Sequence, residues 1–491
     1  MTRLVVVSNR VANFDAKDAN TGGLATALKS ALEESGGIWF GWSGSVCTTS
    51  TPSLHVKHYG RVARATLDLP KADYDGFYTG FANGTLWPLL HFRVDLMKYD
   101  REAHAAYQRV NDRFAQELHK LLKPDDIIWI HDYQLFALGR KLRRLGVNQQ
   151  IGFFLHTPFP TWQILSALPV HRDLASDLAA YDLVGTQTAD DAEAMQTFLK
   201  RMLGIRFIGS EAPLGTRRLR VQAFPISIDP ERVNQEAARA ASSQTTRNLR
   251  KSLNGRNLIL GVDRLDYTKG IPHRLEAVGQ FMRHFPERVD DVTYLQISPP
   301  TREEVSAYQQ LRTEVEETVG RINGQFSGFD AGPIRYLRKS FSQTALFGFY
   351  RTARVGLVTP LRDGMNLVAK EYVASQDAGD PGVLVLSEFA GASKELDGAL
   401  IVNPHDIDAV ALAIHRALNM PREERIARHH ASMERLRDND LANWRGSFLK
   451  ALASQGSGFD IVVDPARAAS AVRPPLRPNG SAQIRPSAFS R

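Results

Sequence analysis

The 491-residue chain has a single cysteine, Cys47, and no long apolar run. One cysteine cannot close an internal disulfide or supply the thiolates of a zinc site, so a secreted disulfide scaffold is excluded and a reducing cytoplasm is expected. The N-terminal apolar segment, Leu4-Val5-Val6-Val7, is too short for a signal-peptide core. Because no segment approaches the ~18–20 apolar residues of a membrane span, we expect no membrane association.

The excess of positive charge is small and unevenly distributed. Lys and Arg number 61 against 53 Asp and Glu, which gives a net charge of +8. Five arginines and no acidic residue fall within 465–491, so this stretch accounts for +5 and the rest of the chain carries only +3. The Arg/Pro-rich composition of 459–491 predicts a disordered tail. Because positive and negative charges are nearly balanced in the rest of the chain, a general nucleic-acid-binding surface is not expected.

Short β-branched runs alternate with helix-period segments along most of the chain. The runs are continuously apolar, as in strands covered on both faces, and the alternation predicts an α/β fold with doubly wound parallel sheets. Strands are predicted at 4–8, 127–131, 151–156, 183–186, 220–224, 258–262, 293–297, 334–337, 355–359, 383–386 and 399–402. Helices are predicted at 191–203, 273–285, 301–321 and 407–418, among others. Segment 37–69, rich in glycine and tryptophan, is expected to be a small antiparallel insertion.

A polar, helix-prone stretch after Phe224-Pro225 divides this pattern into two halves. We expect a Rossmann-like domain over 1–228, a second over 229–440, and a final helix over 441–458. Open parallel sheets bind ligands beyond the carboxyl ends of their strands. We expect the two domains to face each other across a central cleft. The candidate site residues are therefore those that directly follow each strand.

Polar segments follow three predicted strands of the first half. Arg10 follows the first strand, and Gly22-Gly23 stands at the next helix start, where bare amides can approach a phosphate. This glycine pair is neither a dinucleotide fingerprint nor a P-loop, and it is more typical of a plain loop. His131-Asp132 and His156 follow two further strands. They are consistent with a polar sugar site or with satisfied structural groups.

In the second half, Arg264 and Lys269 lie five residues apart across a turn that follows a strand. Both can converge on one phosphate, although a solvated turn with an internal Asp–Arg pair is the alternative. Segment 359–371 is a strand, a glycine-containing turn and a helix start, whose amides can face a sugar or diphosphate. Glu371 on that helix can accept two ribose hydroxyls. An acid/base role for Asp363 with Glu371 is less favoured, because no facing nucleophile is evident.

No motif predicts a metal or a cofactor. The chain lacks His-x-x-x-His and clustered-carboxylate spacings of metal sites. Asp73-Tyr74-Asp75 is similar to the manganese-binding Asp-x-Asp of some sugar transferases, but it lies outside the series of parallel strands. His429-His430 falls on a charged helix and is expected to be solvated.

Several ordered blocks together resemble the trehalose-6-phosphate synthases, a family of retaining glucosyltransferases that join UDP-glucose to glucose 6-phosphate. The resemblance spans about 1–455 and implies the two-domain GT-B architecture, with the final helix crossing back to the first domain and a dimeric or tetrameric assembly. The blocks are 4–10, Gly22-Gly23-Leu24, 39–44, Leu86-Trp87-Pro88, 128–133, 152–156, 264–270 and 356–372.

The resemblance also implies residue roles. Arg10 and Arg302 would bind the acceptor phosphate, and Tyr78, Trp87 and Asp132 the acceptor sugar. The residues implied at the nucleotide sugar are Gly22, Gly23, His156, Arg264, Lys269, Phe341, Asp363, Gly364, Met365, Asn366, Leu367, Val368 and Glu371. Of the whole set, the catalytic residues would be Arg264, Lys269, Asp132, His156 and Asp363. Their cations would stabilise the leaving diphosphate without a metal.

Some features depart from the family pattern and leave alternatives open. Thr157 and Ser342-Gln343-Thr344 differ from the common residues, which weakens inference about the donor base. The alternatives are a related transferase with another base or another acceptor, such as glycerol 3-phosphate, and a non-catalytic sugar-phosphate sensor. No Asp-x-Asp-x-Thr phosphatase motif follows, so a separate trehalose-6-phosphate phosphatase is expected downstream.

Overall fold

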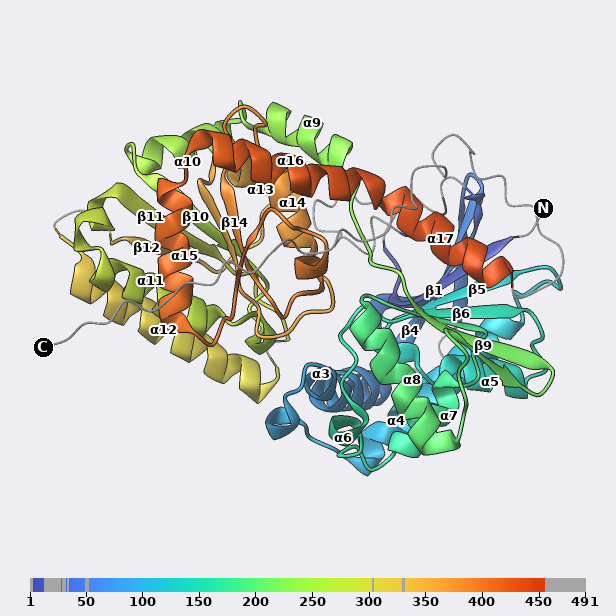
Figure 1. Cartoon of the computed structure of the whole chain (residues 1–491). Coiled ribbons are helices and arrows are strands. Elements are labelled where there is room, and N and C mark those ends of the chain that lie inside the picture. Colours follow the sequence, from blue (N-terminus) through green and yellow to red (C-terminus); the bar gives the residue numbers. More distant parts are fainter. Residues whose placement is uncertain are drawn as a thin grey trace, which may run out of the picture. The chain divides into compact units, whose positions relative to one another are not determined.

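The computed structural model describes residues 3–12, 28, 32, 35–48, 53–302, 304–328 and 332–454. These residues form two β-sheets, each with helices against it (Figure 1). Gly22, Gly23 and the predicted tail 459–491 lie outside the described residues. None of the described helices is long and apolar enough to cross a membrane.

The first sheet, within the described residues, has nine strands in the order β3-β4-β2-β1-β5-β6-β7-β9-β8. All neighbours pair in parallel except the two edge pairs, β3 with β4 and β8 with β9. The strands are β1 (Leu4–Arg10), β2 (Gly37–Cys47), β3 (Leu54–Tyr59), β4 (Val62–Pro70), β5 (Ile127–His131), β6 (Gln150–Phe154), β7 (Leu183–Thr186), β8 (Glu211–Leu214) and β9 (Arg217–Ala223).

The prediction of an antiparallel insertion at 37–69 is wrong. Strand β2 pairs in parallel with both β1 and β4, and only β3 runs antiparallel, at the edge. The reason lies in burial: Trp39, Phe40 and Trp42 are consecutive core positions, with exposures of 1%, 0% and 6%. A continuously buried run is typical of an interior parallel strand. The glycines around these aromatic residues obscured that pattern.

The first two helices that pack with the first sheet are the short α-helix α2 (Lys71–Asp73) and the π-helix η1 (Tyr74–Leu86). Asp100 caps α4 through its side chain, which accepts the Ala103 amide at 2.7 Å, and Thr188 caps α8 in the same way. The remaining helices here are α3 (Trp87–Leu90), α4 (Arg101–His119), α5 (Leu138–Arg144), α6 (Trp162–Leu165), α7 (His171–Leu178) and α8 (Ala189–Leu203).

The second sheet is entirely parallel, in the order β12-β11-β10-β13-β14-β15. Its strands are β10 (Asn257–Val262), β11 (Val292–Ile297), β12 (Ile334–Leu337), β13 (Val355–Val358), β14 (Val383–Ser387) and β15 (Leu400–Val402). Its helices are α9 (Pro230–Ala240), α10 (Gln244–Leu253), α11 (Ile271–His284), α12 (Ser306–Phe326), α13 (Gln343–Thr352), α14 (Leu367–Ser375), α15 (Ile407–Asn419) and α16 (Arg422–Asp438). The predicted α/β class with two parallel-sheet Rossmann-like domains is confirmed.

Helix α12 begins later than predicted, at Ser306 rather than Thr301. Arg302 explains the difference, because its backbone has a φ of 49°, in the left-handed region that a right-handed helix cannot include. The left-handed residue separates the end of β11 from the helix.

The last two described helices pack against different halves of the molecule. Helix α16 packs against α14 and α9, whereas α17 (Leu441–Ala453) packs against β6 and β7 (Figure 1). Phe448 of α17 stacks on Trp129 of β5 with ring centres 4.9 Å apart. Gly152 and Gly185 make room for this ring, since a Cβ on either glycine would lie within 3.0 Å of it.

Candidate functional site

The predicted site residues follow the carboxyl ends of parallel strands in both sheets. Arg10 ends β1, Asp132 follows β5 and His156 follows β6. In the second sheet, Arg264 and Lys269 follow β10, and Arg302 follows β11. Phe341 follows β12, and Asp363 to Asn366 follow β13. This is the edge at which parallel sheets bind ligands.

Arg10 and Tyr78 both lie beside Trp42. The Arg10 guanidinium carbon is 6.0 Å from the Trp42 ring centre, and the Tyr78 ring centre is also 6.0 Å from it. Tyr78 stacks on Tyr74 at 5.4 Å. Arg10 is exposed and makes no ion pair with any described residue. A cation beside aromatic faces suits a sugar phosphate, whose ring can lie on the aromatic surface.

Arg302 of the second domain contacts the first domain closely. Its guanidinium carbon lies 4.1 Å from the Trp87 ring centre, and Nη2 donates to the Tyr133 hydroxyl at 3.1 Å. The Arg302 side chain is only 7% exposed. Two polar atoms here, Arg302 Nε and Trp87 Nε1, are buried without a hydrogen-bond partner among the described residues. Such groups are costly unless a ligand satisfies them.

His91 packs against the ring of Trp87. The His91 ring lies 4.1 Å from the Trp87 ring, and its Nδ1 donates to the Trp87 carbonyl at 2.8 Å. Burial lowers the pKa of His91 to about 4, so the imidazole is neutral. The guanidinium of Arg264, on the turn after β10, lies 5.8 Å from the same tryptophan ring. Trp87 is therefore within reach of both arginines.

Asp132 and His156 form a half-buried corner after β5 and β6. Asp132 has a φ of 75°, which costs about 1–3 kcal/mol for a non-glycine residue and is often found at functional sites. Its Oδ1 accepts the His156 amide at 3.2 Å. Burial raises the pKa of Asp132 to about 6 and lowers the pKa of His156 to about 3. His156 Nε2 lies 3.1 Å from His131 Nδ1, so one of these neutral rings donates a hydrogen bond to the other.

The turn after β10 brings Lys269 to Asp363. Lys269 Nζ donates to Asp363 Oδ2 at 2.5 Å, and Asn366 Nδ2 donates to the same oxygen at 3.0 Å. Burial raises the pKa of Asp363, but Lys269 and Asn366 outweigh it and hold the pKa below its ordinary value. The carboxylate is therefore ionised, and it fixes the ammonium group beside the turn.

Helix α14 begins at this same turn. Asn366, with a φ of 84°, caps the helix by accepting the Ala369 amide at 3.0 Å. The amides of Leu367 and Val368 lie in the first turn, where no intrahelical carbonyl is available to them. Met365 is buried at 3% exposure and packs the turn onto the domain core. The predicted anion-facing amides are thus at a capped helix N-terminus.

Glu371 lies one turn further along α14 and is buried. Gln343 Nε2 donates to Glu371 Oε1 at 3.0 Å, and burial raises the pKa of Glu371 to about 7. Gln343 stands two residues after Phe341, whose ring packs edge-on against Phe349 at 5.1 Å. The structure therefore brings the predicted ribose and base residues together through Gln343.

Gly364 lies close to the backbone of the segment after β6. A Cβ at this position would lie 2.2 Å from the His156 carbonyl oxygen. Only glycine allows the turn after β13 to lie this near the segment after β6. Asp363 and His156, from different domains, are adjacent for this reason.

Sequence reasoning overlooked the residues that support the predicted ones. His91, Gln343 and Tyr308 were not proposed for the site, Tyr133 was quoted only as part of a motif, and His131 was proposed without its partner. Gln343 alone carried a signal, as a departure from the family pattern. The others are polar residues within helices or apolar strands, where the pattern indicates burial but not partners.

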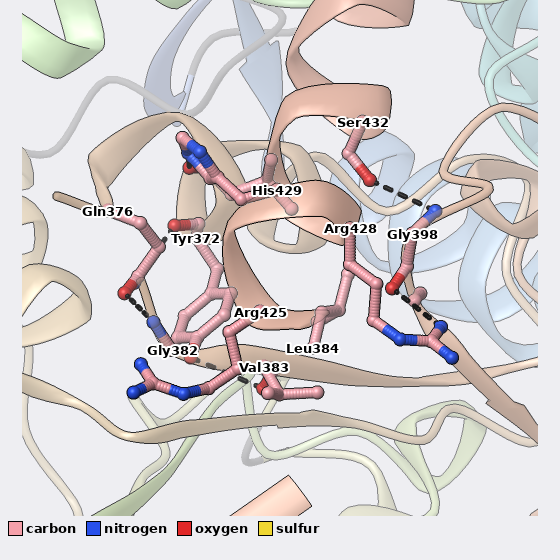
Figure 2. A pocket seen from close by; sticks show the side chains of 12 residues that line it. Tyr372, Gln376, Gly382, Val383, Leu384, Gly398, Arg425, Arg428, His429 and Ser432 are labelled. Carbon is pink, nitrogen blue, oxygen red and sulfur yellow. Dashed lines mark hydrogen bonds between the residues drawn. The ribbon is translucent and has the colours of Figure 1, made fainter. Parts of the chain in front are cut away.

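A small cavity lies between α14 and α16 (Figure 2). Its volume of about 20 Å³ holds roughly one water and no sugar. Its polar groups are engaged: Gln376 Oε1 accepts the Gly382 amide, and Ser432 Oγ accepts the Gly398 amide. His429, expected to be solvated, instead lies half-buried on this cavity, 3.2 Å from the Val373 carbonyl. A solvated position is therefore wrong for His429.

The described residues contain no cluster of three or more His, Cys, Asp and Glu that could hold a metal ion. Asp73 pairs with Arg109 at 3.0 Å, and Asp75 pairs with Lys71. Both carboxylates of the manganese-like motif are thus engaged in ordinary surface ion pairs.

Two parallel-sheet domains, with cations and a capped helix start after their strands, define a glycosyltransferase of the GT-B type. The chain belongs to glycosyltransferase family 20, which matches residues 3–454. It is 45% identical over 453 residues to a trehalose-6-phosphate synthase of Klebsiella pneumoniae subsp. pneumoniae, covering 92% of this chain and 95% of that protein. The predicted family is therefore confirmed.

Solved structures agree with this assignment. The chain is similar to a UDP-forming alpha,alpha-trehalose-phosphate synthase from Burkholderia xenovorans in complex with glucose-6-phosphate, with a TM-score of 0.88, 47% identity and coverage of 92% and 100% of the two chains. It is also similar to the trehalose-6-phosphate protein from E. coli bound with UDP-2-fluoro glucose, with a TM-score of 0.87, 42% identity and coverage of 92% and 99%.

Proposed function

We propose that this glycosyltransferase transfers glucose from UDP-glucose to glucose 6-phosphate, producing α,α-trehalose 6-phosphate and UDP with retention at the anomeric carbon. The observation that carries the proposal is the Trp87 ring, which lies 4.1 Å from the Arg302 guanidinium and 5.8 Å from that of Arg264. One arginine belongs to the acceptor set and the other to the donor set. The related proteins bind glucose 6-phosphate and a UDP-glucose analogue, which supports both substrates.

On the acceptor side, Arg10 and Arg302 bind the phosphate in this proposal. Tyr78, Trp87 and Asp132 hold the sugar. Two buried donors without a partner among the described residues, Arg302 Nε and Trp87 Nε1, support these roles. A phosphate or hydroxyl oxygen can satisfy each of them. The ionised form of Asp132 accepts sugar hydroxyls.

On the donor side, Arg264 and Lys269 bind the diphosphate, and the amides after Asn366 face it. His156 and Asp363 hold the transferred glucose, Glu371 the ribose, and the segment around Phe341 the base; Gly22 and Gly23 complete the donor site. Negative charge grows on the diphosphate as the glycosidic bond breaks, so these cations stabilise the transition state more than the ground state. The leaving phosphate oxygen takes the acceptor proton on the same face, and no protein nucleophile or metal is required.

A donor-by-acceptor activity matrix tests the proposal. UDP-, ADP- and GDP-glucose are combined with glucose 6-phosphate and glycerol 3-phosphate, nucleotide release is measured, and products are identified by mass and NMR. We expect UDP release and trehalose 6-phosphate from the first pair. Faster turnover with another base or acceptor would point to a different transferase. Tight substrate binding without UDP release would point to a sensor.

Three features of its cellular context belong to the same proposal. The enzyme acts in the cytoplasm, it assembles as a homodimer or homotetramer, and a separate phosphatase removes the phosphate from its product. Sedimentation of the purified chain tests the second of these.

A further inference from the structure

A buried hydrogen-bonded chain links the acceptor-side arginine to the donor turn. Arg302 Nη1 donates to the Tyr308 hydroxyl at 2.6 Å, and this hydroxyl donates to Asp266 Oδ2 at 3.0 Å. Arg302 Nη1 also lies 3.6 Å from the same carboxylate oxygen. Asp266 and Tyr308 are 0% and 2% exposed, so water does not compete for these bonds. Buried networks of this kind are stronger than the same bonds in water.

The second oxygen of Asp266 shapes the donor turn. Its Oδ1 accepts both the amide and the hydroxyl of Thr268, each at 3.0 Å, which caps the short helix η4 (Tyr267–Lys269). The Lys269 amide donates to the Asp266 carbonyl at 3.0 Å. Burial raises the pKa of Asp266, but Arg302 and Arg264 outweigh burial and hold it below the ordinary value, so the carboxylate is charged. One carboxylate thus contacts the acceptor arginine and sets the turn that carries Lys269.

The other end of the chain is anchored in the first domain. Arg302 Nη2 donates to the Tyr133 hydroxyl at 3.1 Å, and that hydroxyl donates to Asn83 Oδ1 at 2.8 Å. With Nη1 and Nη2 engaged, Nε is the donor of the Arg302 guanidinium that has no partner among the described residues. A phosphate that binds at Nε meets a guanidinium already fixed to both domains.

We propose that Asp266 and Tyr308 are positioning residues that couple the two substrate sites. The inference rests on the proposed function, since it takes Arg302 as an acceptor-phosphate ligand and Lys269 as a diphosphate ligand. A phosphate that immobilises Arg302 also immobilises Tyr308 and Asp266, and with them the turn bearing Lys269. By thermodynamic reciprocity, a diphosphate on that turn strengthens acceptor binding by the same factor.

Calorimetry on the full chain measures this coupling. The Kd of UDP is determined with and without saturating glucose 6-phosphate, and the ratio of the two values is the coupling factor. We expect at least about fivefold tighter UDP binding with the acceptor present, at the low end of ordinary allosteric couplings. Tyr308→Phe keeps the ring packed on Tyr267 but removes the hydroxyl. We expect its coupling factor to fall to within about twofold of 1, with the Kd of UDP alone changed less than about threefold.

Tyr336→Phe is the matched control, because the Tyr336 hydroxyl is buried and has no hydrogen-bond partner in the described part of the chain. This variant should keep the wild-type coupling factor. If Tyr308→Phe does not fold, Asp266→Asn interrupts the same link from its other end and should lose the coupling equally.

Two outcomes would overturn the coupling. They are a wild-type coupling factor in Tyr308→Phe, and an equal loss in Tyr336→Phe. A wild-type enzyme that forms product but has a coupling factor near 1 would refute the coupling and leave the proposed function standing. Absence of product from UDP-glucose and glucose 6-phosphate would refute both.

Discussion

Replacing Gly364 with alanine should lower the activity of the enzyme strongly while leaving each domain folded. The new Cβ would lie 2.2 Å from the His156 carbonyl oxygen, whereas side-chain Cβ atoms essentially never approach closer than 3.0 Å. The backbone must therefore retreat by at least about 0.8 Å, the difference between these distances. The atoms that the new Cβ would meet, in His156 and Thr157, all belong to the backbone, so no change of side-chain rotamer relieves the clash.

The retreat displaces Asp363, the neighbour of Gly364, from its 2.5 Å contact with Lys269 or from His156. A misplacement of about 1 Å can lower the rate of a chemical step about 100-fold, and we expect a decrease in kcat of this order. Initial rates of UDP release over a range of both substrates separate kcat from KM. Because the clash lies between two domains, their separation relieves it and the melting temperature should change little.

Gly320→Ala is the matched control for this substitution. Gly320 lies in α12, is exposed, and a Cβ there would meet no atom within 4 Å. Alanine in a helix interior is more favourable than glycine by roughly 0.5–1 kcal/mol, so this variant should retain activity and be no less stable. Wild-type kcat in Gly364→Ala, or an equal loss in Gly320→Ala, would refute the reasoning about close approach.

Four other expectations are open to direct measurement. Glu371, with a pKa raised to about 7 by burial, must be ionised to accept ribose hydroxyls. The KM for UDP-glucose should therefore rise toward about tenfold per pH unit below pH 7, and a pH-independent KM would contradict this role; Glu371→Gln should abolish the dependence. Arg264→Ala and Lys269→Ala should each lower kcat/KM about 100-fold or more with unchanged circular dichroism, and near-normal turnover in both would refute the diphosphate assignment. Arg10→Ala should raise the KM for glucose 6-phosphate about tenfold, whereas an effect confined to UDP-glucose would assign Arg10 to the donor. Dialysis against EDTA should leave turnover unchanged, and loss restored by a divalent cation would show that a metal is required.

The fold class and family were predictable because they depend on patterns that a sequence displays directly. Runs such as 258–262 and 293–297 are continuously apolar, and polar residues follow them at the point where a parallel strand ends. Strand β2 was misjudged because its burial is clear only once Trp39 and Phe40 are seen between β1 and β4. The domain boundaries and the roles of the individual site residues stay predictions.

Contacts between distant residues could not be predicted in the same way. Arg302 was expected to bind a phosphate, but the sequence does not show that its guanidinium contacts Tyr133, Tyr308 and Asp266. These partners are up to 169 positions away. Their meeting depends on how two domains fold and on the left-handed backbone at Arg302, which no local pattern indicates.

The contact between α17 and the first sheet has a consequence for the order of synthesis. Trp129 is made early, but Phe448, which stacks on it, is made more than 300 residues later by position in the chain. Until then, the apolar surface at Trp129, Gly152 and Gly185 lacks its covering helix. During synthesis the first domain therefore exposes this apolar surface, which can aggregate or bind chaperones until α17 has been made. The last of the described helices thus completes the first domain to be started.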